Sequence, residues 1–127
     1  MPIETIRDQE RNLTTHFVTG AVSEEEMHAT LEAFYDQEPT AQVLWDMSQS
    51  ELAHVDAQML SRFVQKAAAL GTSRRGCRTA VIAPGDFQYG LGRMSEAFAE
   101  IENTPYKFRV FRSQENALRW LGYEDNS

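Results

Sequence analysis

Short apolar runs alternate with longer amphipathic stretches along most of the chain. Residues 43–45 and 79–83 read VLW and TAVIA, without a charged residue, which is typical of strands buried on both faces of a parallel sheet. Each run is followed by a stretch with helical spacing of apolar residues, over about 56–70 and 86–101. This repeated order of strand and helix predicts an α/β fold.

The amino-terminal part of the chain predicts a hairpin. Residues 2–7 and 13–19 have extended character, and the polar residues 8–12 between them can close a turn. Gly20 is expected to end the second strand.

Polar residues mark the starts of four predicted helices. Ser23 is followed three positions later by Glu26, which is the pattern of a capping box. Asp56, Asp86 and Ser113 stand where the N-caps of the next three helices are expected.

The third of these helices carries an apolar stripe whose members repeat at spacings of four, three, four and three. The stripe consists of Phe87, Leu91, Met94, Phe98 and Ile101. We expect it to pack in the core. Gly90 and Gly92 each cost roughly 1 kcal/mol against alanine inside a helix, which indicates that another backbone, a neighbouring chain or a ligand comes close there.

The predicted order is strand, strand, helix, strand, helix, strand, helix, strand, helix. Three right-handed crossovers after a hairpin require a mostly parallel open sheet with helices on its faces. We therefore expect a single domain over residues 1–127. The last strand, 106–111, alternates apolar and polar residues and is expected near an edge.

Composition and charge exclude some classes of function. The net charge of −7 repels nucleic acid, and the basic residues are dispersed except for Arg74, Arg75 and Arg78. The amino terminus lacks the apolar run of a signal peptide, and no window approaches a membrane span. We expect a cytoplasmic protein with no membrane insertion and no nucleic-acid partner.

The residues indicate neither a metal nor another cofactor. His16, His28 and His54 do not share a metal-binding spacing, and the single cysteine excludes an intrachain disulfide. No motif specifies a catalytic residue.

A ligand site is expected beyond the carboxyl ends of the strands, as in other open α/β sheets. The loop Asp46–Ser50 and the segment Pro84–Tyr89 converge there, together with Arg112 and Ser113. The candidate ligand-binding residues are Asp46, Ser48, Ser50, Asp86, Tyr89 and Arg93. Asp46 is expected to anchor its loop, and Asp86 to cap its helix.

Four segments resemble the small SpoIIAA-like, or STAS-like, bacterial domains, which share a fold with the lipid-binding CRAL-TRIO (Sec14-type) domains. The segments are GAVSEEEMHATLEAF, VLWDMSQ, RTAVIAPGDFQYGLGRMSEAF and VFRSQENALRWL. The resemblance covers most of the chain. It implies a binding or regulatory role with no catalysis assigned.

Well-known STAS members are anti-anti-sigma factors that present a phosphorylatable serine in an Asp-Ser-Ser-Gly motif. In this chain Asp56 matches the aspartate of that motif, but Ala57 and Gln58 stand in place of the serines. Ser48 and Ser50 lie upstream and are the remaining candidate phosphoacceptors.

Three functions stay open from the sequence. The first is a non-enzymatic regulatory module that acts through contacts with a protein partner and forms a homodimer. The second is a carrier or sensor of an apolar ligand or lipid, with a cavity between its helices. The third is a small enzyme that uses Asp46 with Tyr89 or Arg93.

Overall fold

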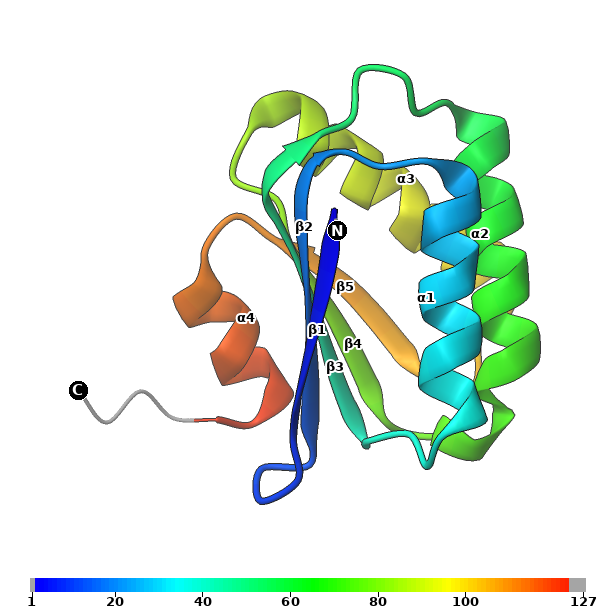
Figure 1. Cartoon of the computed structure of the whole chain (residues 1–127), viewed down its shortest axis with the longest axis vertical. Coiled ribbons are helices and arrows are strands. Elements are labelled where there is room, and N and C mark those ends of the chain that lie inside the picture. The colour runs from blue at the N-terminus through cyan, green and yellow to red at the C-terminus, as the bar shows by residue number, and fades with distance from the viewer. Residues whose placement is uncertain (1, 124–127) are drawn as a thin grey trace.

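The computed structural model describes residues 2–123 as five strands and four helices (Figure 1). The strands are β1 (Ile3–Asp8), β2 (Leu13–Ala21), β3 (Gln42–Glu51), β4 (Arg78–Ile82) and β5 (Lys107–Phe111). The helices are α1 (Glu24–Asp36), α2 (Ala57–Leu70), α3 (Asp86–Ile101) and α4 (Gln114–Leu121), with a short 3₁₀ helix, η1 (Gly71–Arg74), after α2.

The strands lie in the sheet in the order in which they occur in the chain. β1 and β2 are antiparallel, and every other neighbouring pair is parallel. Val43 of β3 lies beside Thr79 of β4, as expected for neighbouring inner strands. The predicted mostly parallel sheet with an N-terminal hairpin is confirmed, and so is the position of β5 at an edge.

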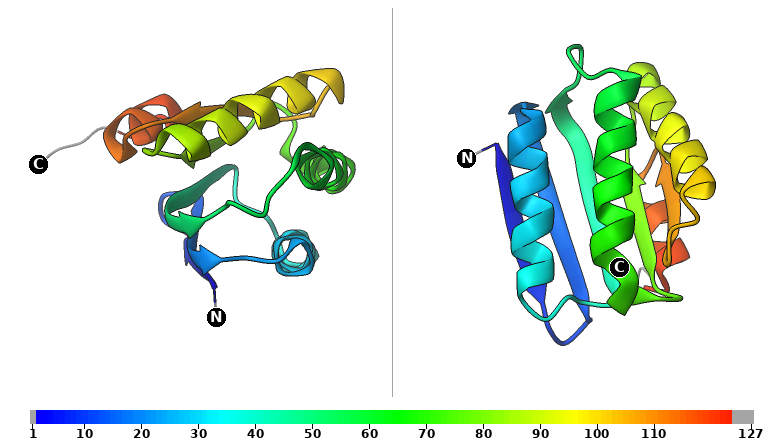
Figure 2. Two further views of the ribbon diagram at one scale, coloured as in Figure 1. Left: turned by 90° about the horizontal axis from the view of Figure 1, so that it is seen from above. Right: turned by 90° about the vertical axis from the view of Figure 1, so that its right-hand side faces the viewer.

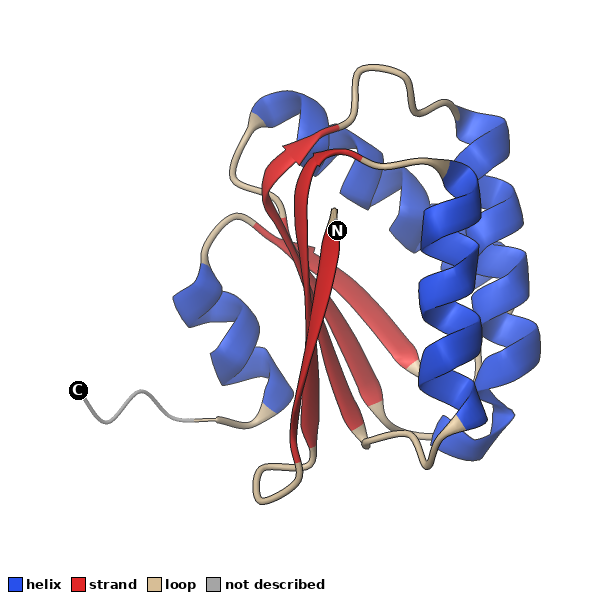
Figure 3. Ribbon diagram, in the orientation of Figure 1, coloured by secondary structure: helices blue, strands red, loops and turns tan. Residues whose placement is uncertain are grey.

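Three helices cover one face of the sheet and one helix covers the other (Figures 1 and 3). α1, α2 and α3 lie in a row, with α3 at the end above β5 (Figure 2). Right-handed crossovers that always step in the same direction along the sheet place their helices on the same face. α4 follows the edge strand β5 and packs on the opposite face.

Alternation along the inner strands supplies two apolar cores. Trp45 faces α1, α2 and α3, whereas its neighbour Leu44 faces α4. The core beneath α4 is the smaller of the two and consists of Leu13, Leu44, Ala80, Ile82, Ala117 and Leu121. The middle strands therefore contribute to both cores.

A buried arginine connects η1 to the starts of β3 and β4. Arg74 is only 2% exposed, and its guanidinium stacks 4.9 Å from the centre of the Tyr106 ring. It donates hydrogen bonds to the backbone oxygens of Thr40, Ala41 and Arg78 and to the hydroxyls of Tyr35 and Thr79. One of the three clustered arginines is thus part of the core.

Two strands extend further than predicted. β2 continues past Gly20 to Ala21, and Gly20 adopts φ +68° within the strand. β3 continues through Glu51, so the expected loop Asp46–Ser50 is wrong. The two extensions pair with each other beyond an irregularity in register, which satisfies the backbone groups of otherwise polar segments.

The helix starts agree with prediction at three of four positions. Ser23 and Glu26 form the capping box, with N···O distances of 2.9 and 3.0 Å. Asp56 and Ser113 accept hydrogen bonds from the first turns of α2 and α4.

The predicted cap of α3 is wrong by one residue. Gly85 is the N-cap and Asp86 is the first helical residue. The Gln88 side chain accepts a hydrogen bond from the Gly85 amide at 3.3 Å. The glutamine therefore satisfies the amide of the N-cap residue, whereas the aspartate was expected to accept from an amide of the first helical turn.

The apolar stripe of α3 is only partly in the core. Leu91 is buried, but Phe87, Met94 and Ile101 are 56, 39 and 74% exposed. The helix is rotated so that Gly92 faces the sheet, where an added Cβ would lie 2.4 Å from Val110. The helix thus approaches β5 closely through a glycine, and this rotation turns part of the predicted stripe outward.

Candidate functional site

Arg112 gathers two of the predicted site residues at the carboxyl edge of the sheet. Its guanidinium donates to the Asp86 carboxylate at 2.8 Å and lies 4.3 Å from the centre of the Tyr89 ring. It also donates to the backbone oxygen of Pro84 at 3.3 Å. We call Asp86, Tyr89 and Arg112 the Arg112 cluster. Asp86 and Arg112 are exposed and Tyr89 is half-buried, so the cluster carries one carboxylate, one cation and one aromatic ring.

Ser50 ties the end of β3 to α3. Its hydroxyl donates to the backbone oxygen of Met47 at 2.6 Å. The Gln88 amide donates to the Ser50 backbone oxygen at 2.9 Å and lies 3.4 Å from its hydroxyl. This junction holds the carboxyl end of β3 against the first turn of α3.

Asp46 and Ser48 interact with each other. Asp46 Oδ1 accepts from the Ser48 amide at 3.0 Å and from the Ser48 hydroxyl at 2.6 Å. These bonds lie where the register between β2 and β3 shifts. Asp46 therefore anchors backbone, as expected, although in an irregular strand rather than in a loop.

The combination of Asp46 with Tyr89 or Arg93 has no geometric support. Asp46 alternates with Trp45 and so lies on the α4 side of the sheet, whereas α3 packs on the opposite side. Arg93 is 65% exposed and pairs with Glu96 at 3.3 Å. The six predicted site residues therefore do not come together in one site.

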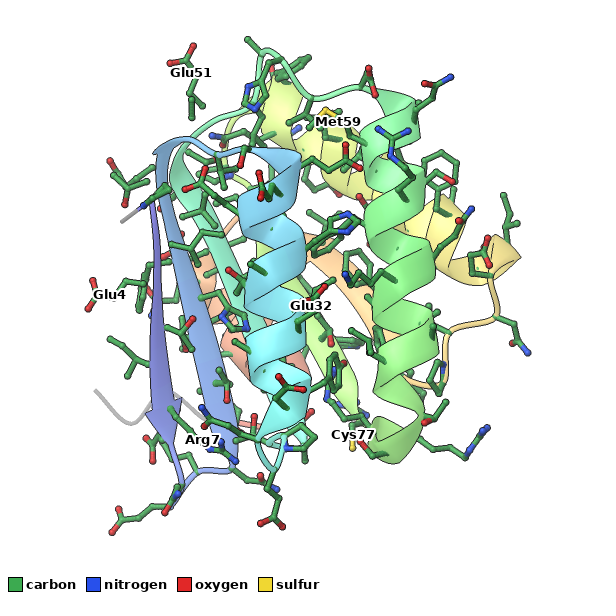
Figure 4. The ribbon with its side chains drawn as sticks, turned by 45° about the vertical axis from the view of Figure 1, so that its right-hand side comes forward. Glu4, Arg7, Glu32, Glu51, Met59 and Cys77 are labelled. Atoms are coloured by element: carbon green, nitrogen blue, oxygen red, sulfur yellow. The ribbon has the colours of Figure 1, made fainter. Side chains whose placement is uncertain are left out.

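An apolar pocket lies between the sheet and the three helices on its larger face. Its volume is about 90 Å³. Its wall includes Met27, Trp45, Met47, Met59, Phe63 and Phe108. Figure 4 shows Met59 near the upper ends of α2 and α3. Three flexible thioethers and three aromatic rings suit a small apolar molecule.

His28 contributes a polar atom to the wall of this pocket. Its Nε2 is buried and has no hydrogen-bond partner within residues 2–123, and Glu24 Oε2 lies 3.6 Å away. The imidazole meets the Phe63 ring edge to face, at 6.3 Å between centres. A ligand with one hydrogen-bonding group could therefore be oriented by His28.

A second hollow lies between β1 and α1 and has a volume of about 500 Å³. His16 lies at its floor, 1% exposed, with Nδ1 2.8 Å from the Thr5 hydroxyl. Burial, aided by the charge of Arg74, lowers the pKa of His16 to about 4. The imidazole is therefore neutral at physiological pH.

Exposed ion pairs connect α1 to α2. Arg62 pairs with Glu24, and Lys66 with Glu32, which lies on α1 in Figure 4. The hydrogen bond from Arg62 lowers the pKa of Glu24. Glu24 lines the pocket beside His28, and its pair with Arg62 keeps its carboxylate ionised there.

Sequence reasoning did not assign a site role to several of these residues. Arg112 was recognised as lying at the carboxyl edge, and Gln88 carried no signal. The pocket residues have the same helical and strand spacing as ordinary core residues. Only the position of His28 on the same face as Met27 and Leu31 could have pointed to a polar atom at a buried wall.

Within residues 2–123, no group of three or more His, Cys, Asp or Glu side chains is arranged to hold a metal ion. None of the described helices has the length and hydrophobicity needed to cross a membrane.

Comparison with known proteins finds similarity to solved structures alone. No protein-family model matches the chain, and no curated protein is significantly similar to it. A crystal structure of an anti-sigma factor antagonist from Mycobacterium paratuberculosis matches 94% of this chain and 93% of its own, with 15% sequence identity and a TM-score of 0.47. At this level the similarity assigns no role to any residue.

Proposed function

We propose that the chain is a non-enzymatic regulatory module of the STAS-like type that binds a protein partner at the carboxyl edge of its sheet. The observation that carries this proposal is the first turn of α3. Phe87 is 56% exposed there, beside the Arg112 cluster. A large apolar side chain exposed next to an arginine and a tyrosine has the composition of a protein-binding surface.

The charged groups of this surface are accessible. The side chain of Arg112 is 51% exposed, and that of Asp86 is 96% exposed. An ion pair so open to water contributes little to folding. Arg112 can therefore exchange Asp86 for a carboxylate of a partner with little effect on the stability of the domain.

Photo-crosslinking in the cells that express the protein tests this proposal. Benzoylphenylalanine in place of Phe87 is expected to capture one partner, and the same group in place of Glu10 on the exposed hairpin is the control. The captured protein is then purified and its affinity measured. We expect Phe87→Ala and Arg112→Ala each to weaken binding at least about tenfold, because such residues are typical hot spots.

Glu10→Ala is expected to bind the partner as the wild type does. Capture from position 10 as strong as from position 87, or equal affinity of all three variants, would show that the carboxyl edge is not the binding surface.

The apolar pocket supports a second function, the binding of a small apolar ligand. About 90 Å³ admits a few heavy atoms, such as the end of an acyl chain or a short alcohol. Three methionines allow the wall to adjust, and His28 offers one hydrogen-bonding atom.

Thermal unfolding with n-hexanol tests the second function. We expect hexanol to raise the Tm of the wild type, because a ligand that binds only the folded state stabilises it. Met27→Trp, which fills the pocket, should abolish the increase, and Glu25→Trp on the exposed side of α1 should keep it. An equal response of the two variants would exclude binding in this pocket.

Ser48 and Ser50 remain proposed phosphoacceptors. Both hydroxyls donate to internal oxygens, so a phosphate on either would remove a hydrogen bond of about 1 kcal/mol at the end of β3. Mass spectrometry of the protein from its own cells, with Ser48→Ala and Ser50→Ala variants, identifies the modified residue. Unmodified protein under all growth conditions would remove both candidates.

A further inference from the structure

The outward side of α3 carries exposed apolar and small residues. Packing within the described part of the chain does not account for them. We define the α3 stripe as Gly90, Met94, Ala97 and Ile101, which recur at spacings of four, three and four. All four are exposed, with Met94 at 39% and Ile101 at 74%. In Figure 2, α3 lies at the end of the row of helices, with this side uncovered by another helix.

No contact within residues 2–123 explains the glycine at position 90. An added Cβ at Gly90 would meet no atom of the described residues within 4 Å, whereas one at Gly92 would clash with Val110. Glycine inside a helix costs roughly 1 kcal/mol against alanine. The sheet beneath α3 explains why position 92 requires a glycine. The close approach of another molecule from outside would explain the glycine at position 90.

We propose that the α3 stripe pairs antiparallel with the α3 stripe of a second copy of this chain. In this arrangement Met94 lies over Ala97 of the second copy, and Ile101 lies over Gly90 of the second copy. Twofold symmetry repeats each contact. Every large side chain thereby meets a small one, which allows the helices to approach closely. A parallel pair would instead place Met94 on Met94 and Gly90 on Gly90.

Charge supports the same register. Arg93 and Glu100 flank the stripe on one side, seven residues apart. When Met94 lies over Ala97 of the second copy, Arg93 comes opposite Glu100 of the second copy, and symmetry forms this pair twice. The side chain of Arg93 is 65% exposed, and its ion-pair partner within residues 2–123 is Glu96, whose carboxylate also accepts a hydrogen bond from the Val110 amide. Glu100 is exposed and forms no ion pair within residues 2–123.

This inference rests on the protein-contact role proposed above and names a different surface for it. The stripe excludes the Arg112 cluster, and Phe87 would lie past the end of the second copy's α3. A dimer could therefore present two carboxyl edges to a protein partner. The two surfaces can be tested separately.

Charge reversals give a test that is specific for the register. Arg93→Glu alone places two glutamates opposite each other at both pairs, and Glu100→Arg alone places two arginines there. Each variant alone is expected to dimerise at least about tenfold more weakly than the wild type in sedimentation equilibrium. An equimolar mixture of the two variants restores opposite charges at both pairs, so it is expected to dimerise at close to wild-type affinity.

Glu4→Arg is the matched control, because Glu4 lies at the opposite edge of the sheet (Figure 4) and the change in charge is the same as in Glu100→Arg. It should leave dimerisation unchanged. Circular dichroism verifies folding, since Arg93→Glu also places a second glutamate beside Glu96. Ile101→Asp, at the most exposed position of the stripe, provides a variant that avoids this contact, and it should be monomeric.

Three results would overturn the inference. They are a wild type that remains monomeric up to about 1 mM, a dimer unaffected by the reversals, and a mixture that dimerises no better than its components. None of these results affects crosslinking from position 87, so failure of the dimer and failure of the partner surface are distinguishable. A dimer with the expected response and no crosslinked partner would retain the inference and remove the carboxyl-edge proposal.

Discussion

His16 shows how burial fixes the charge of one residue. Its ring lies 4.3 Å from that of Trp45 and 5.7 Å from that of Phe34, between ring centres. Desolvation and the nearby cation of Arg74 both disfavour the imidazolium, so the pKa falls from 6.5 to about 4. The folded state therefore requires a neutral histidine.

This pKa predicts a loss of stability in acid. Between pH 6.5 and about 4 the unfolded chain binds a proton at His16 and the folded chain does not, so the free energy of unfolding falls as the pH falls. The loss attributable to His16 is about 3 kcal/mol. Urea unfolding of the wild type and of His16→Gln at several pH values in this range measures this loss. It appears as the difference between the two slopes of the free energy of unfolding against pH. Parallel slopes would contradict the pKa.

Arg74 forms no ion pair with the residues that the structure describes, yet its replacement is expected to have a large effect on stability. Arg74→Ala would leave five oxygen atoms without their donor in the core, and we expect a loss of about 4 kcal/mol or more. Arg75→Ala is the matched control, because Arg75 is the next residue and its side chain is exposed. This variant should change stability by less than about 0.5 kcal/mol. Chemical denaturation of both variants measures the difference. Similar midpoints would show that the guanidinium is replaceable by water.

Only some of the structural roles of single residues could be predicted from the sequence. Caps such as Ser23 and Asp56 were predictable because their partners lie three residues away. The role of Arg74 was not, because its acceptors lie up to 39 positions from it and become neighbours only when the sheet forms. The same holds for the contact of Arg112 with Asp86, 26 positions apart.

At the scale of elements, the pattern predicted which segments are strands and helices but not how far they extend. The strand β3 contains a polar half, Asp46–Glu51, that resembles a loop in sequence. It is extended because β2 continues beside it and supplies hydrogen bonds. Pairing with a neighbour, which is a tertiary interaction, overrides the local preference of these residues.

The rotation of α3 about its axis gives a prediction with opposite signs at two nearby glycines. Gly92→Ala forces a methyl group to 2.4 Å from Val110 Cγ2, so we expect a loss of about 1–3 kcal/mol. Gly90→Ala adds a methyl group in open space and should stabilise the monomer by about 0.5–1 kcal/mol. Unfolding at a concentration low enough to keep the chain monomeric measures both. Destabilisation by Gly90→Ala would mean that α3 is oriented differently.

The same pair of glycines explains why periodicity alone gave the wrong rotation of α3 about its axis. A stripe that includes Phe87, Met94 and Ile101 is as apolar as a core stripe, and a sequence pattern does not distinguish burial in the chain from burial against a partner. The space available to a side chain at Gly92 decides the rotation. This depends on Val110, which belongs to the next strand.

At the scale of the whole molecule, the two cores share one sheet. β3 contributes Trp45 to the larger core and Leu44 to the smaller one, and β4 contributes Val81 to the larger core and Ala80 to the smaller one. Loss of either core removes support from the same strands. The molecule is therefore expected to unfold as one cooperative unit, although α4 packs apart from the other helices.

The two tryptophans lie on opposite faces of the sheet and test this cooperativity. Trp45 is buried beneath α1, α2 and α3, whereas Trp120 belongs to α4 and packs against Phe111 at 5.6 Å between ring centres. In Trp120→Phe the fluorescence comes from Trp45 alone, and in Trp45→Phe it comes from Trp120 alone. We expect the fluorescence midpoint in urea to coincide with the circular dichroism midpoint of the same variant in both cases, because α4 has only the shared strands to pack on. The comparison within each variant cancels the change in stability that the substitution itself causes. If the Trp120 signal were lost at a lower urea concentration than the circular dichroism signal, α4 would be a separately unfolding element and the smaller core would not be needed to hold the sheet.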